Sequence, residues 1–458
     1  MLEIALSNSA TPQTAPVVKG LPFIGPLMSL IRNPFGFMSR AREQYGDIYT
    51  VDFGFLQATV FNHPQHAQHI LRDNAANYSK GGPLWDSVRA LLGNGLVVSE
   101  GNFWLRQRRL MQPQFHRQRL AALTDLMVSA IDESLQSWAM AADSDKPANM
   151  APRFNQLTMN VIVKTLFGTG LSGEEVTTVS QSMEFALDFV LKGVMAQSLP
   201  TWFPFPGRNK FKKAIADYDK VVYRMIQECR QGHQDKHHLL AMLLDTVDEE
   251  TGEQMSDQQL RDEVATLFLA GFETTAIVLS WAFALLAQHP DILAKLKAEV
   301  DTVLGKRQPT FQDLPNMPYS RMVLQEVMRL RPPSWWLPRT AVADDEVDGY
   351  HIPAGTQVVS LTYMYHNHPD SWENPEQFDP ERFQPDQVAK RHKYAWVPFG
   401  AGQRLCIGRD FALMEGQLAL VMALQQYDIA PAGTQLPQPM LSSTLRPKGG
   451  VQIYLRKR

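Results

Sequence analysis

A free cysteine just before a predicted helix is the residue of this chain that is best placed to do chemistry. Cys406 lies in the segment Phe399-Gly-Ala-Gly-Gln-Arg-Leu-Cys-Ile-Gly408, and the pattern predicts a helix from Gly408 to about Gln426. The unpaired N–H groups and the positive dipole end of a helix N-terminus stabilise a thiolate and lower the pKa of its thiol. The sequence therefore favours Cys406 as a reactive or metal-binding thiolate.

The residues around this cysteine suit a flat, anionic ligand. Gly400, Gly402 and Gly408 would let the backbone approach such a ligand closely. Arg404 lies two residues before Cys406, and a guanidinium group binds carboxylates well. An isolated free cysteine is more often a small buried core residue. The glycines and the arginine together favour the ligand role over the core role.

A second segment with chemical potential is Ala270-Gly-Phe-Glu-Thr-Thr275, in the middle of the apolar stretch Ala265 to Ala287. The Thr274 hydroxyl can bond back to the carbonyl of Ala270 and so open a groove for a small ligand. Glu273 is costly to bury unless it is paired or functional, and an acid beside a hydroxyl suits proton delivery. Taken alone, the segment is equally compatible with packing threonines and an ion-paired glutamate.

Two further pairs have helical spacing. Glu326 and Arg329 share one helix face within ion-pair reach, and their apolar neighbours favour a half-buried structural pair. Trp104 and Arg108 present two donors on one face, suited to a carboxylate. The segment 106–119 is rich in arginine, which is compatible with a solvated basic face or with a docking patch for an acidic redox partner. These arginines are Arg106, Arg108, Arg109, Arg117 and Arg119.

The remaining pattern predicts a mainly helical protein with a minor β region. Long amphipathic runs follow one another from about 104 to 300, and Gly81, Gly82, Gly93 and Gly95 predict a mobile loop before them. Strands are predicted within 48–62, with a turn near Gly54, and within 340–362 and 451–455. Without a repeat or a low-complexity linker, we expect one domain at 20–458 after an irregular segment at 1–19.

Composition narrows the class of protein. The 458 residues are 44% hydrophobic and 20% charged with a net charge of −3, which fits a soluble globular protein and gives no reason to expect nucleic-acid binding. Two cysteines cannot form a disulfide framework or a four-cysteine iron–sulfur cluster. The first residues do not have the pattern of a signal peptide or an anchor, so we expect a cytoplasmic protein. The stretch 265–287 could span a bilayer, but its polar residues favour a buried central helix without stable membrane insertion.

Together these segments resemble the cytochrome P-450 superfamily, in family order over roughly 20–455. The signature F-x-x-G-x-R-x-C-x-G is met by Phe399, Gly402, Arg404, Cys406 and Gly408. The motif [AG]-G-x-[DE]-T-T is met by 270–275, E-x-x-R by Glu326 and Arg329, and W-x-x-x-R by Trp104 and Arg108. The resemblance implies a single-domain cytochrome P-450 fold of the soluble bacterial type.

The resemblance also implies a cofactor and a set of roles. The cofactor would be haem b, iron protoporphyrin IX, with Cys406 as the thiolate ligand of the iron. Thr274 and Glu273 would support protonation of dioxygen. The remaining residues expected at the haem are Trp104, Arg108, Arg339, Phe399, Gly402, Arg404, Gly408 and Ala270. A structural network would comprise Glu326, Arg329 and Arg382.

The implied reaction inserts one oxygen atom from O2 into a small apolar substrate, such as a terpenoid, a fatty acid or a steroid. Electrons would come from a separate ferredoxin or flavodoxin with its reductase. Residues expected to face the substrate are Trp85, Phe268, Leu269, Trp335, Trp336 and Leu445, and the two adjacent tryptophans suggest a bulky apolar wall. The alternatives are a peroxide-driven or isomerising haem-thiolate enzyme and a non-catalytic haem-binding sensor or carrier.

Overall fold

The structure is a computed structural model that describes residues 13–20, 25–54, 56–168, 171–197, 205–232 and 238–458. Residues 1–12 of the predicted irregular segment therefore lie outside the described residues. Contacts divide the chain into two compact units. Unit 1 comprises Met1–Gly82, Trp335–Pro375 and Arg391–Leu405, and unit 2 comprises Pro83–Ser334, Glu376–Lys390 and Cys406–Arg458.

Unit 1 is built on a five-stranded sheet with the order β2-β3-β9-β6-β4. The strands β3 and β9 pair in parallel, while β2, β6 and β4 join their neighbours in antiparallel register. The strand bounds are β2 (Ile48–Asp52), β3 (Gln57–Phe61), β4 (Tyr78–Ser79), β6 (Leu337–Ala341) and β9 (Gln357–Ser360). The predicted hairpin within 48–62 is confirmed, and Gly54 at its turn has a φ of 78°.

A smaller sheet of unit 1 has the order β1-β8-β7. Its strands are β1 (Gln13–Thr14), β7 (Asp345–Val347) and β8 (Tyr350–Ile352), so part of the segment expected to be irregular is paired. The helices of unit 1 are α1 (Leu27–Arg32), α2 (Pro34–Tyr45), α3 (Pro64–Gln68), the π-helix η1 (His69–Asp73), α15 (Thr362–Tyr365) and the short 3-10 helices η2 (Ala75–Asn77), η6 (Lys393–Ala395) and η7 (Gly402–Arg404).

Unit 2 is mainly helical, as predicted. Its longer helices are α4 (Pro83–Leu92), α5 (Gly101–Met111), α6 (Arg117–Gln136), α8 (Met150–Phe167), α9 (Gly173–Gln197), α10 (Arg208–Arg230), α12 (Asp257–Gln288), α13 (Pro290–Val303), α14 (Pro318–Leu330) and α17 (Arg409–Gln426). Shorter ones are α7 (Ala139–Ala142), α11 (Leu239–Leu244), α16 (Pro385–Lys390), η3 (Gln112–Phe115), η4 (Phe311–Asn316) and η5 (Pro380–Phe383). The helix α4 occupies much of the stretch predicted to be a mobile loop, so that prediction was wrong.

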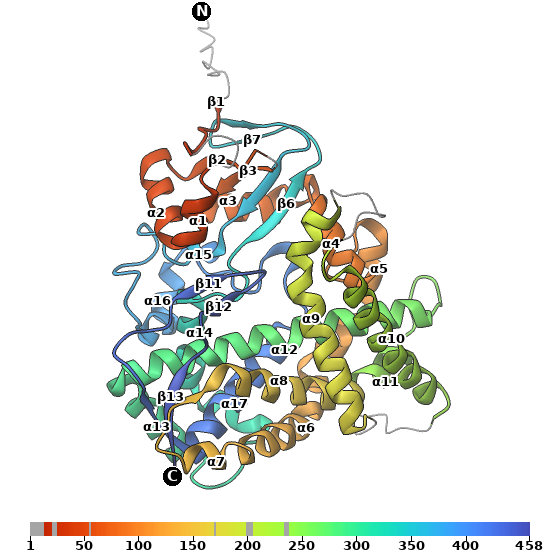
Figure 1. Ribbon diagram of the computed structural model, residues 1–458, viewed down its shortest axis with the longest axis vertical. Helices are drawn as coiled ribbons and strands as arrows, with labels where there is room; N and C mark the ends of the chain where they lie inside the picture. Colours follow the sequence, from red (N-terminus) through yellow and green to blue (C-terminus); the bar gives the residue numbers. More distant parts are fainter. Residues whose placement is uncertain (1–12, 21–24, 55, 169–170, 198–204, 233–237) are drawn as a thin grey trace, which may run out of the picture. The chain divides into compact units, whose positions relative to one another are not determined.

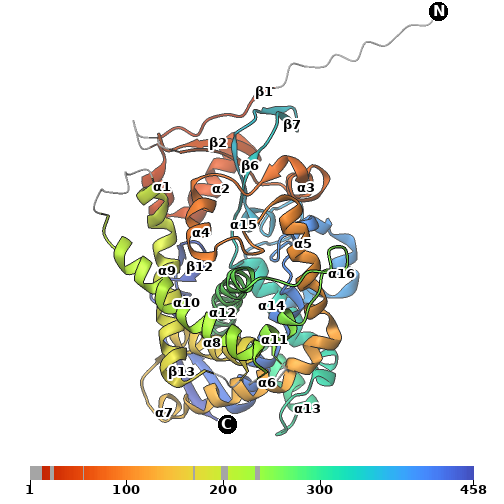
Figure 2. The same ribbon diagram turned by 90° about the vertical axis from the view of Figure 1, so that its right-hand side faces the viewer.

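The helix α12 is the centre of unit 2 and carries the Ala270–Thr275 motif. It begins at a capping box, in which Ser256 and Gln259 bond each other's backbone N–H. It packs against α8, α10, α14 and α17, and Figure 2 shows it nearly end-on within a ring of helices. The helix is long and apolar enough to cross a membrane, but 78% of its apolar window is buried inside the protein. The expectation of a buried central helix is therefore confirmed.

Short strands bring the C-terminal part of the chain to α12. The strands β10 (Tyr427–Pro431) and β13 (Gln452–Lys457) pair antiparallel, and β5 (Ala148–Asn149) extends them. The predicted final strand is thus confirmed. The hairpin formed by β11 (Pro439–Leu441) and β12 (Leu445–Pro447) packs against α12 through β12 (Figure 1). Trp281 of α12 donates from its indole Nε1 to the Leu445 carbonyl at 2.9 Å.

Candidate functional site

The thiol of Cys406 lies at the open N-terminus of α17. Cys406 is exposed, which excludes the role of a small core residue. Gly408 occupies the N-cap of α17 and offers no side chain to the first N–H groups of the helix. The helix end therefore presents uncapped donors and positive dipole charge beside the thiol. A cysteine in this setting is suited to hold a metal ion as a thiolate.

The other cysteine has a different environment. Cys229 on α10 is half-buried, and burial raises the pKa of its thiol to about 11. A thiol with a raised pKa is a poor ligand because the thiolate is the binding form. The two cysteines therefore differ in exposure, and Cys406 is the better candidate for a metal ligand.

A cation lies close to Cys406 in unit 2. Burial lowers the pKa of Arg108 on α5, and the charge of Cys406 acts in the opposite direction. The Arg108 Nε atom donates to Gln112 at 3.0 Å, and Trp104, one turn earlier, is 7% exposed. One helix thus carries a nearly buried indole and, one turn later, a half-buried guanidinium that interacts with the charge of Cys406.

The centre of α12 has one open face. From Leu260 to Ala287 each residue is buried except Leu269, Ala270, Gly271 and Thr274. These four are grouped at the middle of the helix, where the Thr274 hydroxyl donates to the Ala270 carbonyl at 2.8 Å. The predicted backward bond is confirmed. These four residues leave one face of the helix partly exposed at its middle. A Cβ at Gly271 would lie 2.7 Å from Ile162 Cδ1, so this position has no space for a larger side chain.

Glu273 points to the hairpin rather than to the open face. It is 5% exposed, and its Oε1 atom accepts from the Thr444 hydroxyl at 2.9 Å and from Arg446 Nε at 2.7 Å. Arg446 also binds Asp188 on α9 at 3.1 Å. Burial raises the pKa of Glu273, while Arg446 and Thr444 work against that rise. The acid and the hydroxyl predicted as a pair therefore have different partners.

The Glu326–Arg329 pair is more deeply buried than the sequence suggested. Both side chains are 0% exposed, and Arg329 donates to Glu326 through two atoms at 2.6 and 2.8 Å. Glu326 also accepts the Asp379 backbone N–H at 3.0 Å and lies 3.5 Å from Arg382 Nε. The predicted network of these three residues is present, and it joins α14 to the segment around η5.

Two arginines of the arginine-rich segment are paired with acids of unit 2. Arg109 binds Asp248 at 2.9 Å and also Glu250. Arg106 binds Glu253 at 3.2 Å. The acidic loop 248–253 thus neutralises two of the five arginines. The pairing involves Arg106 and Arg109, and a docking role for the segment 106–119 stays a prediction.

Unit 1 contains the remaining haem-facing residues predicted from the sequence. Arg339 on β6 is 7% exposed and donates to the Pro338 carbonyl at 2.7 Å. Phe399 and Arg404 are half-buried. Gly402, with a φ of 64°, is needed for a reason that the sequence did not show: a Cβ there would lie 1.9 Å from the Leu71 carbonyl oxygen of η1. Its missing side chain thus serves a contact with the protein's own backbone.

The residues predicted to face the substrate fall into two groups. Leu269 on α12, Trp85 on α4 and Trp336 are half-buried, and Trp336 stacks on Trp335 with ring centroids 5.0 Å apart. Phe268 and Leu445 are 0% exposed. Phe268 packs on Tyr218 and Phe272 in the core, so neither its side chain nor that of Leu445 reaches open space in this structure.

Two buried acids were missed in the sequence. Glu415 on α17 is 1% exposed, and burial raises its pKa well above the usual range, with the Thr275 hydroxyl acting against the rise. Glu263 on α12 is also 1% exposed and has a pKa raised to about 8 by burial. The available signal was an acid within an apolar helical run, which is costly unless it serves a purpose.

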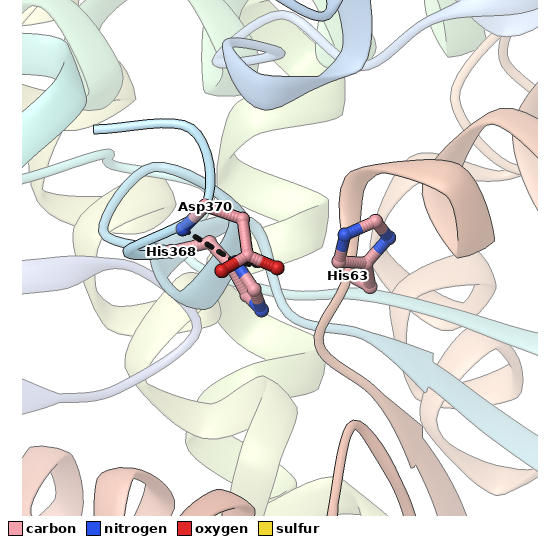
Figure 3. Close-up of side chains that lie close together, drawn as sticks. All are labelled: His63, His368 and Asp370. Carbon is pink, nitrogen blue, oxygen red and sulfur yellow. Dashed lines mark hydrogen bonds and ion pairs between the residues drawn. The ribbon is translucent and has the colours of Figure 1, made fainter.

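A cluster of possible metal ligands in unit 1 is committed to local hydrogen bonds. His63, His368 and Asp370 bring donor atoms within 4.8 Å of one another (Figure 3). However, His63 Nδ1 accepts the Gln65 N–H and His368 Nδ1 accepts the Asp370 N–H, both at 3.3 Å. The Arg42 guanidinium lies 3.2 Å from His368 Nε2. A metal ion would have to displace these bonds and face a fixed positive charge, so we assign the cluster to local capping.

Comparison with known proteins identifies the family. The chain matches the cytochrome P450 family model over residues 15–454 and belongs to that family. It is 34% identical over 437 residues to cyclooctat-9-en-7-ol 5-monooxygenase of Streptomyces melanosporofaciens, covering 94% of each chain. It is 32% identical to pentalenene oxygenase of Streptomyces avermitilis, covering 89% of this chain and 90% of the relative. The protein is therefore an oxidoreductase of the cytochrome P450 type.

The fold agrees with this assignment. The crystal structure of the cytochrome P450DA haem domain superposes with a TM-score of 0.89 at 26% identity, covering 98% of this chain and 99% of that chain. The mainly helical cytochrome P450 fold predicted from the sequence is thus confirmed, and the family implies a haem-thiolate cofactor.

Proposed function

We propose that this protein is a monooxygenase that inserts one oxygen atom from O2 into a polycyclic terpenoid. The observation that carries the proposal is the exposed Cys406 thiol at the uncapped start of α17, with Arg108 beside it. The terpenoid class is supported by the relatives named for cyclooctat-9-en-7-ol and pentalenene. We place the protein in the cytoplasm, with electrons supplied by a separate ferredoxin or flavodoxin and its reductase.

The residues of unit 2 fit haem b. Cys406 offers a thiolate, the Trp104–Arg108 pair offers donors to a propionate, and the open face at Ala270 and Thr274 offers space for a flat ring. When bound, the haem iron would activate O2, and a thiolate ligand supplies the electron density that favours O–O cleavage. In unit 1, we assign Arg339 and Arg404 to propionates, and Phe399 and Gly402 to the loop before the cysteine.

Glu273 and Thr274 would deliver protons to O2. Burial raises the pKa of Glu273, so it holds a proton more readily than an exposed carboxyl does, and a carboxyl of this kind can act as a proton donor. Thr444 and Arg446 are positioning residues that fix its carboxylate. The Thr274 hydroxyl already donates to Ala270, so its oxygen is free to accept a further hydrogen bond from a ligand at the open face. The presence of both Glu273 and Thr274 supports an O2-dependent route over a peroxide-driven one.

The test uses purified haem-loaded protein with a surrogate ferredoxin and reductase. Cyclic terpenes, fatty acids and steroids are first screened by the spin-state shift of the haem, and binders are then turned over under isotopically labelled O2. We expect terpenes to give the largest shifts and the product to contain one labelled oxygen atom. Product formed with peroxide but not with the electron donor, or no product from any class, would contradict the proposal.

A further inference from the structure

Two neighbouring carboxylates of α12 hold the loop that follows α4. Asp262 Oδ2 accepts the Asn94 backbone N–H at 2.8 Å, and Glu263 Oε2 accepts the Leu96 backbone N–H at 2.9 Å. The two acids are 6% and 1% exposed. A backbone N–H group that is buried needs an acceptor, and these two side-chain oxygens supply one to each loop amide. The loop 93–96 is therefore fixed to α12 by side chains that are closed off from water.

The residue before these acids binds the same segment. Arg261 Nη1 donates to the Leu91 carbonyl at 3.2 Å, and its Nε atom binds Asp219 of α10 at 2.6 Å. Three consecutive residues of one helix thus bind three backbone groups of the segment 91–96. We call Arg261, Asp262 and Glu263 the loop clamp.

Glycines in the loop permit this close approach. A Cβ at Gly93 would lie 2.1 Å from Asp262 Oδ1, and Gly93 has a φ of 61°. A Cβ at Gly95 would lie 2.0 Å from the Thr266 hydroxyl oxygen. Other residues at these positions would push the loop off the helix. The glycines that the sequence pattern assigned to mobility instead allow tight packing.

The two acids of the clamp differ in their electrostatic surroundings. Asp262 accepts from Gln258 at 2.9 Å and from Arg261 at 3.2 Å, so its charge is compensated. The pKa of Glu263 is raised to about 8. Burial and the charge of Asp262 raise it, and the hydrogen bond from the Leu96 N–H opposes them. A carboxyl with this balance is largely protonated at neutral pH while the loop is closed.

Other titratable groups around this part of α12 have partners of their own. On α10, Asp219 pairs with Arg261 and Tyr223 donates to Gln258, while Tyr218 lies against Arg261. On α4, Arg89 binds Asp86 and the Val98 carbonyl. At the cap of α11, His238 bonds the Leu166 carbonyl, and on α8 Lys164 pairs with Glu133. The charge that acts on the pKa of Glu263 is instead that of Asp262.

We propose that Asp262 and Glu263 are positioning residues that hold the 93–96 loop closed on α12, and that opening of this loop releases a proton from Glu263 to solvent. Opening exposes the carboxyl to water, where it ionises at neutral pH, and closure takes the proton up again. Because the closed state binds the proton more tightly, closure is favoured at low pH. It weakens as pH rises from the ordinary carboxyl range towards about 8.

The loop directly follows the helix that carries Trp85, which we expect to face the substrate. Loop opening would then set the access of apolar molecules to the site, and access would increase with pH. This last step rests on the proposed function, whereas the clamp itself does not.

The clamp is tested by hydrogen exchange on the full-length protein, followed at the amides of Asn94 and Leu96 from pH 6 to pH 9. After correction for the intrinsic exchange rate, we expect the opening constant of Leu96 to rise by up to about tenfold per pH unit below pH 8 and then level off. Glu263→Gln keeps an acceptor for the Leu96 N–H but does not titrate, so its opening constant should not change with pH.

A matched control is Glu299→Gln. Glu299 on α13 also has a pKa raised by burial and accepts backbone N–H groups, those of Tyr319 and Ser320 at 2.7 and 2.8 Å. This variant should leave the pH dependence at Leu96 unchanged. Gly95→Ala should raise the opening constant at every pH, because its Cβ collides with Thr266. A pH-independent opening constant in the wild-type protein, or an unchanged slope in Glu263→Gln, would overturn the proposal.

The link to substrate access has its own measurement. The rate at which a terpene shifts the haem spin state should rise with pH in the wild-type protein and stay level in Glu263→Gln. A pH-independent rate alongside the expected exchange result would overturn the access role and leave the clamp standing. Failure to bind haem would overturn the proposed function, while the exchange result would still decide the clamp.

Discussion

Arg446 donates from its Nε atom to Glu273 Oε1 at 2.7 Å and so joins the β11–β12 hairpin to the centre of α12. Arg446 lies 173 positions after Glu273 in the sequence. The same guanidinium binds Asp188, which is 61% exposed. Arg446 therefore connects a buried acid to the surface of unit 2, and it opposes the rise that burial causes in the pKa of Glu273.

Replacing Arg446 with Gln should leave Glu273 protonated to higher pH, because burial then acts without an opposing cation. We expect the pH at which the Glu273 carboxyl ionises to rise, as followed by infrared difference spectroscopy with Glu273→Gln as the blank. In turnover, the fraction of electrons recovered in product should fall several-fold. Arg456→Gln, at an exposed position on β13, is the control and should change neither quantity. An unaltered ionisation of Glu273 in Arg446→Gln would contradict this assignment.

Replacing Glu326 with Ala should destabilise the fold by about 3–5 kcal/mol, since it leaves the fully buried Arg329 without its counter-charge. Chemical denaturation measures this change. The exposed pair Lys213–Asp217 provides the comparison, and Asp217→Ala should cost less than about 0.5 kcal/mol. Similar losses in the two variants would show that the buried network has no special structural role.

Gly402→Ala should destabilise unit 1 more than Gly400→Ala does. Both glycines have positive φ, at 64° and 68°, so both substitutions carry a strain of about 1–2 kcal/mol. At Gly402 the new Cβ would also lie 1.9 Å from the Leu71 carbonyl oxygen, whereas at Gly400 the nearest atom is 3.9 Å away. Thermal unfolding and haem content of the two variants check the difference. Equal effects would mean that the Leu71 contact is unimportant.

Glu415→Gln should make stability less dependent on pH. The folded protein holds the Glu415 proton more tightly than the unfolded chain does, so rising pH favours unfolding of the wild type. Stability contributed by the neutral carboxyl is complete at low pH and is lost as pH rises above the ordinary carboxyl range, by at most about 1.4 kcal/mol per pH unit. The variant should therefore melt at the wild-type temperature near pH 4.5 and above it at pH 8. A constant difference across this range would contradict a protonated Glu415.

The local geometry of residues that lie close together in the sequence could be predicted. The thiolate setting of Cys406, the backward bond of Thr274 and the Glu326–Arg329 pair all depend on neighbours within one helix or turn. The burial of α12 could be predicted from the length of its apolar stretch. The hairpin within 48–62 followed from two strand-like runs around Gly54.

Contacts between distant segments could not be predicted from one sequence. Neither the partners of Glu273 on the β12 side nor the acidic loop that neutralises Arg106 and Arg109 has a local signal. The same limit explains why glycines at 93 and 95 suggested mobility when they permit packing on α12. Phe268 was placed near the substrate by its position along α12, but the helix turns it into the core.

The carbon monoxide spectrum of the reduced protein tests the identity of the iron ligand most directly. We predict the strongly red-shifted Soret band of thiolate ligation in the wild-type protein. Cys229→Ser should keep this band, because burial raises the pKa of the Cys229 thiol and makes it a poor ligand. Cys406→His should lose that band. A protein that binds no haem, or a red-shifted band that survives in Cys406→His, would contradict the assignment of Cys406 as the axial ligand.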